Sequence, residues 1–175
     1  LQLGLALDRL GDRAEATEAY RAALAATTAA DPLKIAERAR AGLKTAPNAT
    51  TAKAYRLSLE GWRALERGAI DEAARALGES LSLRPDDPVT QYRQARLLAA
   101  QKHDTAASSL LDTVMSIGAA LPPSIYAAAC VDSARLHEAQ GDRARAIELY
   151  QNVAGVVGAE RATTLAAQRA LARLR

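Results

Sequence analysis

The segment Gly61-Trp62-Arg63-Ala64-Leu65-Glu66-Arg67-Gly68 contains a pattern that the rest of the chain repeats. The small residue Gly61 is followed seven positions later by a second glycine, and then by Ala73 and Leu77. The same frame returns 34 residues further on, where its four positions hold Ala95, Lys102, Ala107 and Leu111. Self-similarity at such a period is the sequence signature of a repeat architecture.

Two further copies lie at the ends of the chain. One has Ala134, Gly141, Ala146 and Tyr150, and the other has Gly4, Gly11, Ala16 and Tyr20. An insertion at residues 117–121 lengthens one step between copies to 39 residues. In each copy we expect the small residue to lie where two helices of a hairpin come closest, and the turn glycine to adopt left-handed dihedrals. The larger residue would fill the gap to the next helix.

The four copies resemble the tetratricopeptide repeat family. Its loose signature is a small residue in a first helix, a glycine at the turn, and an alanine followed by an aromatic residue in a second helix. The resemblance covers residues 1–27 and 53–157. It implies an all-α fold, a right-handed superhelical solenoid of antiparallel helix hairpins with capping helices. The departures from the signature are Lys102-His103 at a turn, Glu60, Ser133, and a terminal proline in one copy alone (Pro85).

Composition and capping residues agree with helices packed on helices. Apolar residues make up 49% of the chain but only 3% are aromatic, and much of the rest is alanine, the best intrinsic helix former. Asp12-Arg13-Ala14-Glu15 fits a capping box. Asp31 and Asp87 each precede a proline, as an N-cap before a first-turn proline does, and Asn48 is expected to cap the next helix.

A longer duplication suggests two modules. Residues 35–43 match residues 166–174 at five of nine positions, and each stretch follows a repeat with a similar turn sequence. We therefore interpret residues 1–46 as the C-terminal part of one module with its capping helix. Residues 49–175 would be a second module of three hairpins and a C-terminal capping helix, with the junction at residues 45–48. Both could also form one continuous solenoid.

No set of residues predicts catalysis or a metal site. His103 and His137 lack a second ligand type at metal spacing, and we expect His103 to be solvated and His137 to be packed between helices. Cys130 is interpreted as a buried small hydrophobe. Neither an enzyme nor a cofactor is expected.

Charge and composition restrict the partners. The net charge of +3 is interspersed along the chain, unlike the concentrated basic stripe of a nucleic-acid-binding protein, and no apolar run is long enough to span a membrane. The alanine- and arginine-rich composition is typical of bacterial proteins. Because Leu1 already lies in an expected helix, we infer a fragment of a longer protein, and no compartment is assigned.

The resemblance also implies a binding face, because first helices of successive hairpins line a concave groove in this family. The positions that point there, beside Leu65 and Ala99, are Ser58, Trp62, Tyr92, Arg96, Val131, Arg135 and Glu138. Trp, Tyr and Arg are enriched at binding hot spots. Some family members clamp a terminal carboxylate with Lys and Asn on this face, and this chain has neither residue type there.

The main hypothesis is a non-catalytic protein–protein interaction scaffold. Its partner would be a protein or peptide segment, acidic and with apolar anchors, or other repeats of the same full-length chain. The alternative is a structural spacer in a larger repeat protein, without a ligand of its own. Trp62 likewise has two interpretations: it lines the groove, or it packs beneath the helix expected within residues 31–44.

Overall fold

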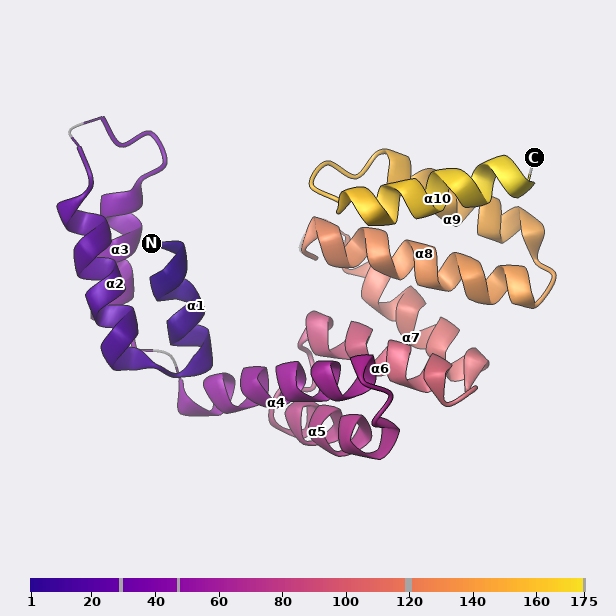
Figure 1. Cartoon of the computed structure of the whole chain (residues 1–175), viewed down its shortest axis with the longest axis horizontal. Coiled ribbons are helices and arrows are strands. Elements are labelled where there is room, and N and C mark those ends of the chain that lie inside the picture. The colour runs from indigo at the N-terminus through magenta and orange to yellow at the C-terminus, as the bar shows by residue number, and fades with distance from the viewer. Residues whose placement is uncertain (29, 47, 119–120, 175) are drawn as a thin grey trace.

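The computed structural model describes residues 1–28, 30–46, 48–118 and 121–174, which form ten α-helices and no strand (Figure 1). The helices are α1 (Gln2–Leu10), α2 (Arg13–Ala25), α3 (Ile35–Lys44), α4 (Ala49–Glu66), α5 (Ile70–Leu83), α6 (Pro88–Ala100), α7 (Asp104–Ser116), α8 (Pro123–Ala139), α9 (Arg143–Ala154) and α10 (Arg161–Leu174). The expected all-helical fold is confirmed. The insertion at residues 117–121 and the junction at residues 45–48 lie only partly within the described residues, because 47, 119 and 120 are outside them.

The helices pack as consecutive hairpins. Helix α1 packs on α2, α4 on α5, α6 on α7 and α8 on α9, and each second helix also contacts the helix that follows it. The first helices α4, α6 and α8, together with α10, contact one another in turn and form one layer. In Figure 1 the group α1–α3 forms one arm and α8–α10 another, with α4–α7 between them.

The N-terminal group contacts the rest of the chain through α1 and α4. There the Arg56 guanidinium donates a hydrogen bond to the carbonyl of Leu10, and Ala52 packs near Gly11. This contact is small beside those within the hairpins. The division into modules at residues 1–46 and 49–175 stays a prediction.

Turn glycines close three of the four first helices as expected. Gly11, Gly68 and Gly141 have φ of 87°, 77° and 84°. Lys102, which replaces glycine in the third copy, adopts the same left-handed region with φ 65°. The turn geometry is therefore kept without glycine, although a side chain in this region costs about 1–2 kcal/mol.

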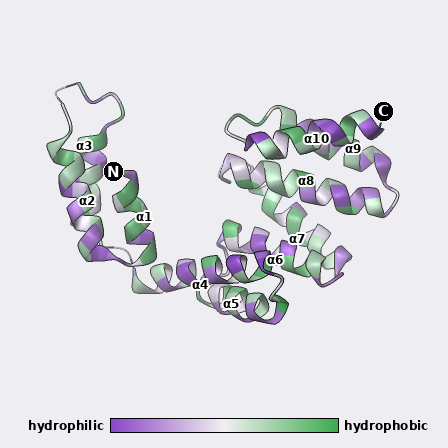
Figure 2. Cartoon of the chain, in the orientation of Figure 1, coloured by the Kyte–Doolittle hydropathy of each residue, from purple (hydrophilic) through white to green (hydrophobic). Residues whose placement is uncertain are grey.

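The small residues lie where hairpin helices approach most closely. A Cβ atom at Gly61 would lie 2.6 Å from Leu77 Cγ, and one at Gly4 would lie 2.6 Å from the Tyr20 ring. Ala95 and Ala134 are fully buried at the equivalent positions. Each helix carries both apolar and polar residues (Figure 2), and the apolar ones form one core cluster per hairpin.

The expected caps are confirmed in two cases and corrected in two. Asn48 accepts a hydrogen bond from the Thr50 amide, and Asp87 accepts one from the Thr90 amide. Asp12 is the N-cap of α2 but its side chain makes no capping bond, so the capping box is not formed. Asp31 and its proline precede α3 by several residues, and the Asp31 carboxylate instead accepts from the amides of Ile35 and Ala36.

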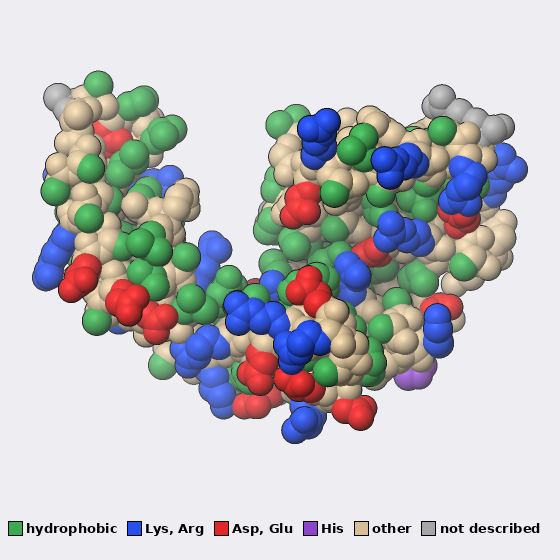
Figure 3. Space-filling model, in the orientation of Figure 1, with side chains coloured by type: hydrophobic (Ala, Val, Ile, Leu, Met, Phe, Trp, Pro, Cys, Tyr) green, Lys and Arg blue, Asp and Glu red, His purple; other side chains and the backbone are tan. Residues whose placement is uncertain are grey.

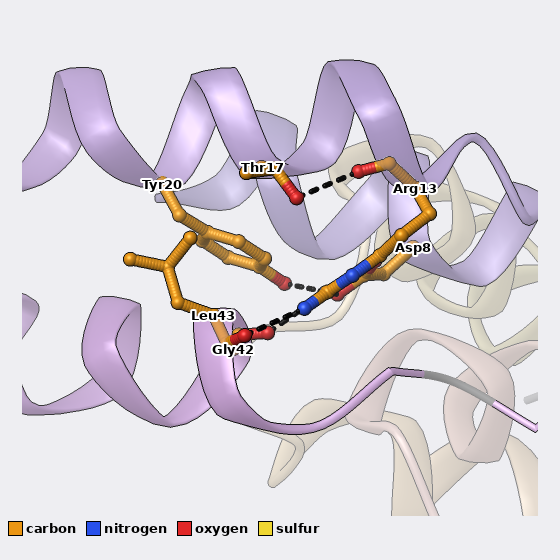
Figure 4. Close-up of polar contacts among 6 residues, drawn as sticks. All are labelled: Asp8, Arg13, Thr17, Tyr20, Gly42 and Leu43. Atoms are coloured by element: carbon orange, nitrogen blue, oxygen red, sulfur yellow. Dashed lines mark hydrogen bonds and ion pairs between the residues drawn. The ribbon is translucent and has the colours of Figure 1, made fainter.

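Helix α3 is fixed to the first hairpin by one arginine. Arg13 donates hydrogen bonds of 2.8 Å to the carbonyls of both Gly42 and Leu43, and it pairs with Asp8 at 3.1 Å (Figure 4). Tyr20 donates a 2.8 Å hydrogen bond to the same carboxylate (Figure 4). These contacts satisfy carbonyls at a helix C-terminus, which have no partner within the helix.

Helix α10 is fixed in the same way to the last hairpin. Arg143, the counterpart of Arg13, donates to the Leu174 carbonyl at 3.0 Å. Tyr150, the counterpart of Tyr20, donates to Glu138 at 3.3 Å. The duplication read from residues 35–43 and 166–174 is thus matched by equivalent hydrogen bonds.

Helix α10 covers the last core through its alanines. Ala167 and Ala170 are buried against Tyr150 and Val153. Leu171 and Leu174 pack at the edge of this cluster. Leu165 and Val157 do not belong to the covered face, because they are 39% and 92% exposed.

Candidate functional site

The candidate site is the surface of the layer formed by α4, α6, α8 and α10, which we call the first-helix face. Its exposed and half-buried side chains include Trp62, Arg93, Arg96, Asp132, Arg135 and Glu138. Figure 3 shows the molecule hollowed between the arm of α1–α3 and the arm of α8–α10, with Lys and Arg side chains gathered over α8–α10. All six residues lie on three adjacent helices because of the repeat spacing.

Trp62 is half-buried against α6. Its ring centroid lies 6.4 Å from that of Tyr92, with the planes tilted by 36°. The guanidinium carbons of Arg96 and Arg93 lie 5.1 and 5.9 Å from the Trp62 ring centroid. Such cation–π contacts stabilise by about 0.5–1 kcal/mol each at exposed sites. Trp62 therefore packs against α6 and not beneath helix α3, so that alternative is wrong.

Asp132 joins the arginines of α6 and α8. Its carboxylate lies 3.5 Å from Arg96 Nε and 3.2 Å from Arg135 Nη1. It also accepts a 2.9 Å hydrogen bond from the Tyr92 hydroxyl. Burial, together with the Asp132 charge, raises the pKa of Tyr92, so this hydroxyl stays a donor. Asp132 was not predicted from the sequence, although it precedes Arg135 by three residues, a spacing at which opposite charges pair on a helix.

Glu138 is engaged by the capping helix. Arg173 donates to it from α10, at 3.0 Å from Arg173 Nη2 to Glu138 Oε2, and Tyr150 donates to it from α9. The Arg173 hydrogen bond is the main cause that lowers the pKa of Glu138. Glu138 is therefore bound to α10 and is only partly accessible to a partner.

Two cavities adjoin along this face. One of about 220 Å³ is lined by Arg96, Asp132 and Arg135, and one of about 580 Å³ by Arg135, Glu138 and Arg173. Arg135 borders both. Together they form a hollow from α6 to α10 with cationic, anionic and small apolar side chains on its walls.

Three residues expected on the face are buried beneath it. Ser58, Tyr92 and Val131 are 2%, 4% and 4% exposed. The Ser58 hydroxyl lies 2.7 Å from the Thr90 hydroxyl, to which it donates, and it accepts a 2.7 Å hydrogen bond from Arg93. These side chains position their neighbours and are not themselves at the surface.

Arg93 was also missed by the sequence analysis. It follows Tyr92 by one residue, a rotation of about 100° around an α-helix. This rotation places Tyr92 in the core and Arg93 at the surface between α4 and α6. Which of two adjacent residues reaches the surface depends on the rotation of the helix about its axis. The family signature does not fix that rotation, so it could not distinguish Tyr92 from Arg93.

Residues set aside in the sequence analysis are packed or solvated as expected. Cys130 is buried with its Sγ 3.6 Å from Met115 Sδ, and burial raises its pKa. His137 is partly buried, with Nδ1 3.3 Å from Asp142, and His103 is exposed. Among the described residues there is no cluster of three or more His, Cys, Asp or Glu side chains suited to a metal ion. Within the same part of the chain, none of the helices combines the length and apolar character that crossing a bilayer requires.

Comparison with known proteins agrees with the repeat pattern. Two family models described as tetratricopeptide repeat match the chain, one over residues 64–127 and one over residues 1–28. No curated protein and no solved structure matches it. The matches include the turns at Gly11, Gly68 and Lys102, and the stacked hairpins have the architecture that such repeats build. The chain belongs to the tetratricopeptide repeat family.

Proposed function

We propose that this chain is a non-catalytic scaffold that binds a segment of a partner protein on its first-helix face. Tetratricopeptide repeats are in general protein-interaction modules. The observation that carries the proposal is the position of Trp62 beside Arg96 on α6, next to a hollow that continues past Arg135. A bound segment would contact Trp62 on α4 and then follow this hollow from α6 across α8 toward α10.

The structure favours a partner with an apolar or aromatic anchor beside its charges. Trp62 offers stacking area that Arg96 already covers in part. Arg96 and Arg135 already share Asp132, so a partner carboxylate has to compete with an internal one. Exposed ion pairs contribute only about 0–1 kcal/mol, so the apolar contact at Trp62 should dominate the affinity.

A spacer without its own ligand is the second candidate. The pairs Arg96–Asp132–Arg135 and Glu138–Arg173 satisfy much of the charge of the first-helix face internally. Because these charges are already paired within the molecule, they do not require a partner protein to neutralise them. The two candidates therefore differ in whether Trp62 is an available anchor.

Peptide selection tests the proposal without knowledge of the partner. Random peptides displayed on phage are selected against the chain, and the affinities of the enriched peptides are measured by fluorescence anisotropy. We expect Trp62→Ala to weaken binding at least tenfold, while Arg75→Ala on the exposed side of α5 leaves it unchanged. Circular dichroism confirms that each variant is folded.

Enrichment of no peptide, or peptides that bind the Trp62→Ala and wild-type chains equally, would overturn the proposal. The spacer candidate would then stand.

A further inference from the structure

We propose that a third cavity, between α1, α4 and the start of α6, binds an anionic oxygen group, a carboxylate or a phosphate monoester, on a protein partner. Its volume is about 300 Å³, and its lining includes Arg9, Arg84, Arg93, Tyr55, Ser58 and Thr90. The identity of the carrier as a protein rests on the proposed function. The anion site itself rests on the charge and hydrogen bonding of the cavity.

Arg93 lacks the carboxylate partner that the neighbouring arginines have. Arg96 and Arg135 pair with Asp132, and Arg173 pairs with Glu138. No ion pair within 4.0 Å involves Arg93 in the described part of the chain. Arg93 donates a 2.7 Å hydrogen bond to the neutral Ser58 hydroxyl. A guanidinium has five N–H donors, so most of its hydrogen-bonding capacity is open.

Arg93 is also desolvated. Burial lowers the pKa of Arg93, and the charges of Asp87 and Glu66 offset this only in part. A half-buried cation without a carboxylate at ion-pair distance is held at an electrostatic cost, since part of its hydration is lost and no ion pair replaces it. An incoming oxyanion would remove that cost and form charge-assisted hydrogen bonds.

The single carboxylate in the lining is already engaged. Asp87 Oδ2 accepts a 2.9 Å hydrogen bond from the Thr90 amide and a 2.6 Å bond from the Thr90 hydroxyl, as the N-cap of α6. The lining thus contains three guanidinium groups, those of Arg9, Arg84 and Arg93, and one carboxylate, that of Asp87, which caps α6. The cavity carries a net positive charge.

The cavity lies beside the stacking surface of the first-helix face. Arg93 lines it and also lies 5.9 Å from the Trp62 ring centroid. A partner segment could place an anion against Arg93 and an apolar or aromatic side chain on Trp62 within a few residues. This arrangement assigns the acidic contact to Arg93 and not to Arg96 or Arg135, which are paired with Asp132.

The chain contains its own reporter for the test, because Trp62 is its only tryptophan. Inorganic phosphate and a hexaglutamate peptide are titrated separately at low ionic strength, with Trp62 fluorescence as the readout. We expect a saturable change that is at least tenfold weaker in Arg93→Gln and weakened in Arg84→Gln. Arg63→Gln makes the same charge change on an exposed part of α4 outside the cavity, and we expect wild-type binding from it.

Each outcome has a defined meaning, with circular dichroism as the control for folding. Saturation with phosphate alone indicates a phosphorylated side chain as the source of the anion, and saturation with hexaglutamate alone indicates acidic side chains. The inference is overturned if neither probe saturates, or if Arg93→Gln and Arg63→Gln behave alike. If selected peptides still require Trp62 in that case, the proposed function survives and only the anion site fails.

Discussion

The Tyr20 hydroxyl lies 2.8 Å from the Asp8 carboxylate, across the two helices of the first hairpin. The last hairpin repeats this arrangement between Tyr150 and Glu138 at 3.3 Å. In both places the carboxylate is held by an arginine as well, Arg13 in one and Arg173 in the other. The two hydrogen bonds differ in burial, since the Asp8 side chain is 12% exposed and that of Glu138 is 23%.

This difference predicts unequal effects of removing the two hydroxyls. Tyr20→Phe should lower the free energy of unfolding by about 1.5–3 kcal/mol, because a buried carboxylate loses a donor. Tyr150→Phe removes a longer hydrogen bond to a more exposed carboxylate, so the free energy of unfolding should fall by clearly less. Urea denaturation followed by circular dichroism measures both. Equal losses in the two variants would show that burial of the acceptor does not set the cost.

The tyrosines should ionise in separate steps at alkaline pH. Burial, with Asp8 adding to it, raises the pKa of Tyr20 to about 12. A tyrosine in the unfolded chain has a pKa of about 10. The stabilisation from protonated Tyr20 is therefore full below that pKa and is lost as the pH rises toward the folded-state value. Ultraviolet absorbance of tyrosinate should show a step near pH 12 that Tyr20→Phe removes, while the late ionisation of Tyr92, whose pKa is also raised, remains. Ionisation of every tyrosine in one step near the unfolded value would contradict this.

Glycine should be the better residue at position 102. Lys102 has φ 65°, a region that glycine adopts without steric cost. We expect Lys102→Gly to raise the free energy of unfolding by about 0.5–1 kcal/mol, after the greater flexibility of glycine in the unfolded chain is subtracted. Lys102→Ala is the control, because it removes the side chain but retains Cβ, and it should give no gain. Wild-type melting temperatures in both variants would show that the left-handed conformation of Lys102 does not destabilise the fold.

Helix α10 should be needed for stability. A chain that ends at Gly158 would expose the face of Tyr150 and Val153 that Ala167 and Ala170 cover. We expect aggregation, or a loss of at least about 2 kcal/mol in the free energy of unfolding. Size-exclusion chromatography and thermal melts measure this. Leu165→Ser, at a 39% exposed position of the same helix, should change stability by less than about 0.5 kcal/mol. A monomeric truncated chain with an unchanged melt would show that α10 is not a cap.

Asp132 should limit the binding of acidic segments to α6 and α8. Asp132→Asn removes the carboxylate that Arg96 and Arg135 share, while the amide oxygen can still accept the Tyr92 hydrogen bond. We expect selected peptides with acidic residues to bind several-fold tighter and with a steeper salt dependence, because both arginines become available. Anisotropy titrations at two salt concentrations test this. Unchanged affinity for every acidic peptide would mean that neither arginine contacts the partner.

The close approaches and turns within each hairpin could be predicted from the amino-acid sequence. Gly61 and Leu77, Gly4 and Tyr20, and the left-handed turns at Gly11, Gly68 and Gly141 all occur where the repeat spacing indicated. These features depend on contacts within one hairpin, and nearest-neighbour contacts of this kind recur with the sequence period in a repeat protein. The alignment of residues 35–43 with 166–174 likewise anticipated that α3 and α10 would be held alike.

The chemistry of the first-helix face depended on three-dimensional packing. Whether Arg96 and Arg135 are free or share Asp132 is decided by the separation of α6 and α8, which no spacing along the chain encodes. Tyr92 and Arg93 are adjacent in sequence, yet one is buried and the other borders a cavity, because a single residue turns a helix by about 100°. The helices follow from local propensity and period, whereas the pairing of charges follows from the rotation and approach of helices that are far apart in the sequence.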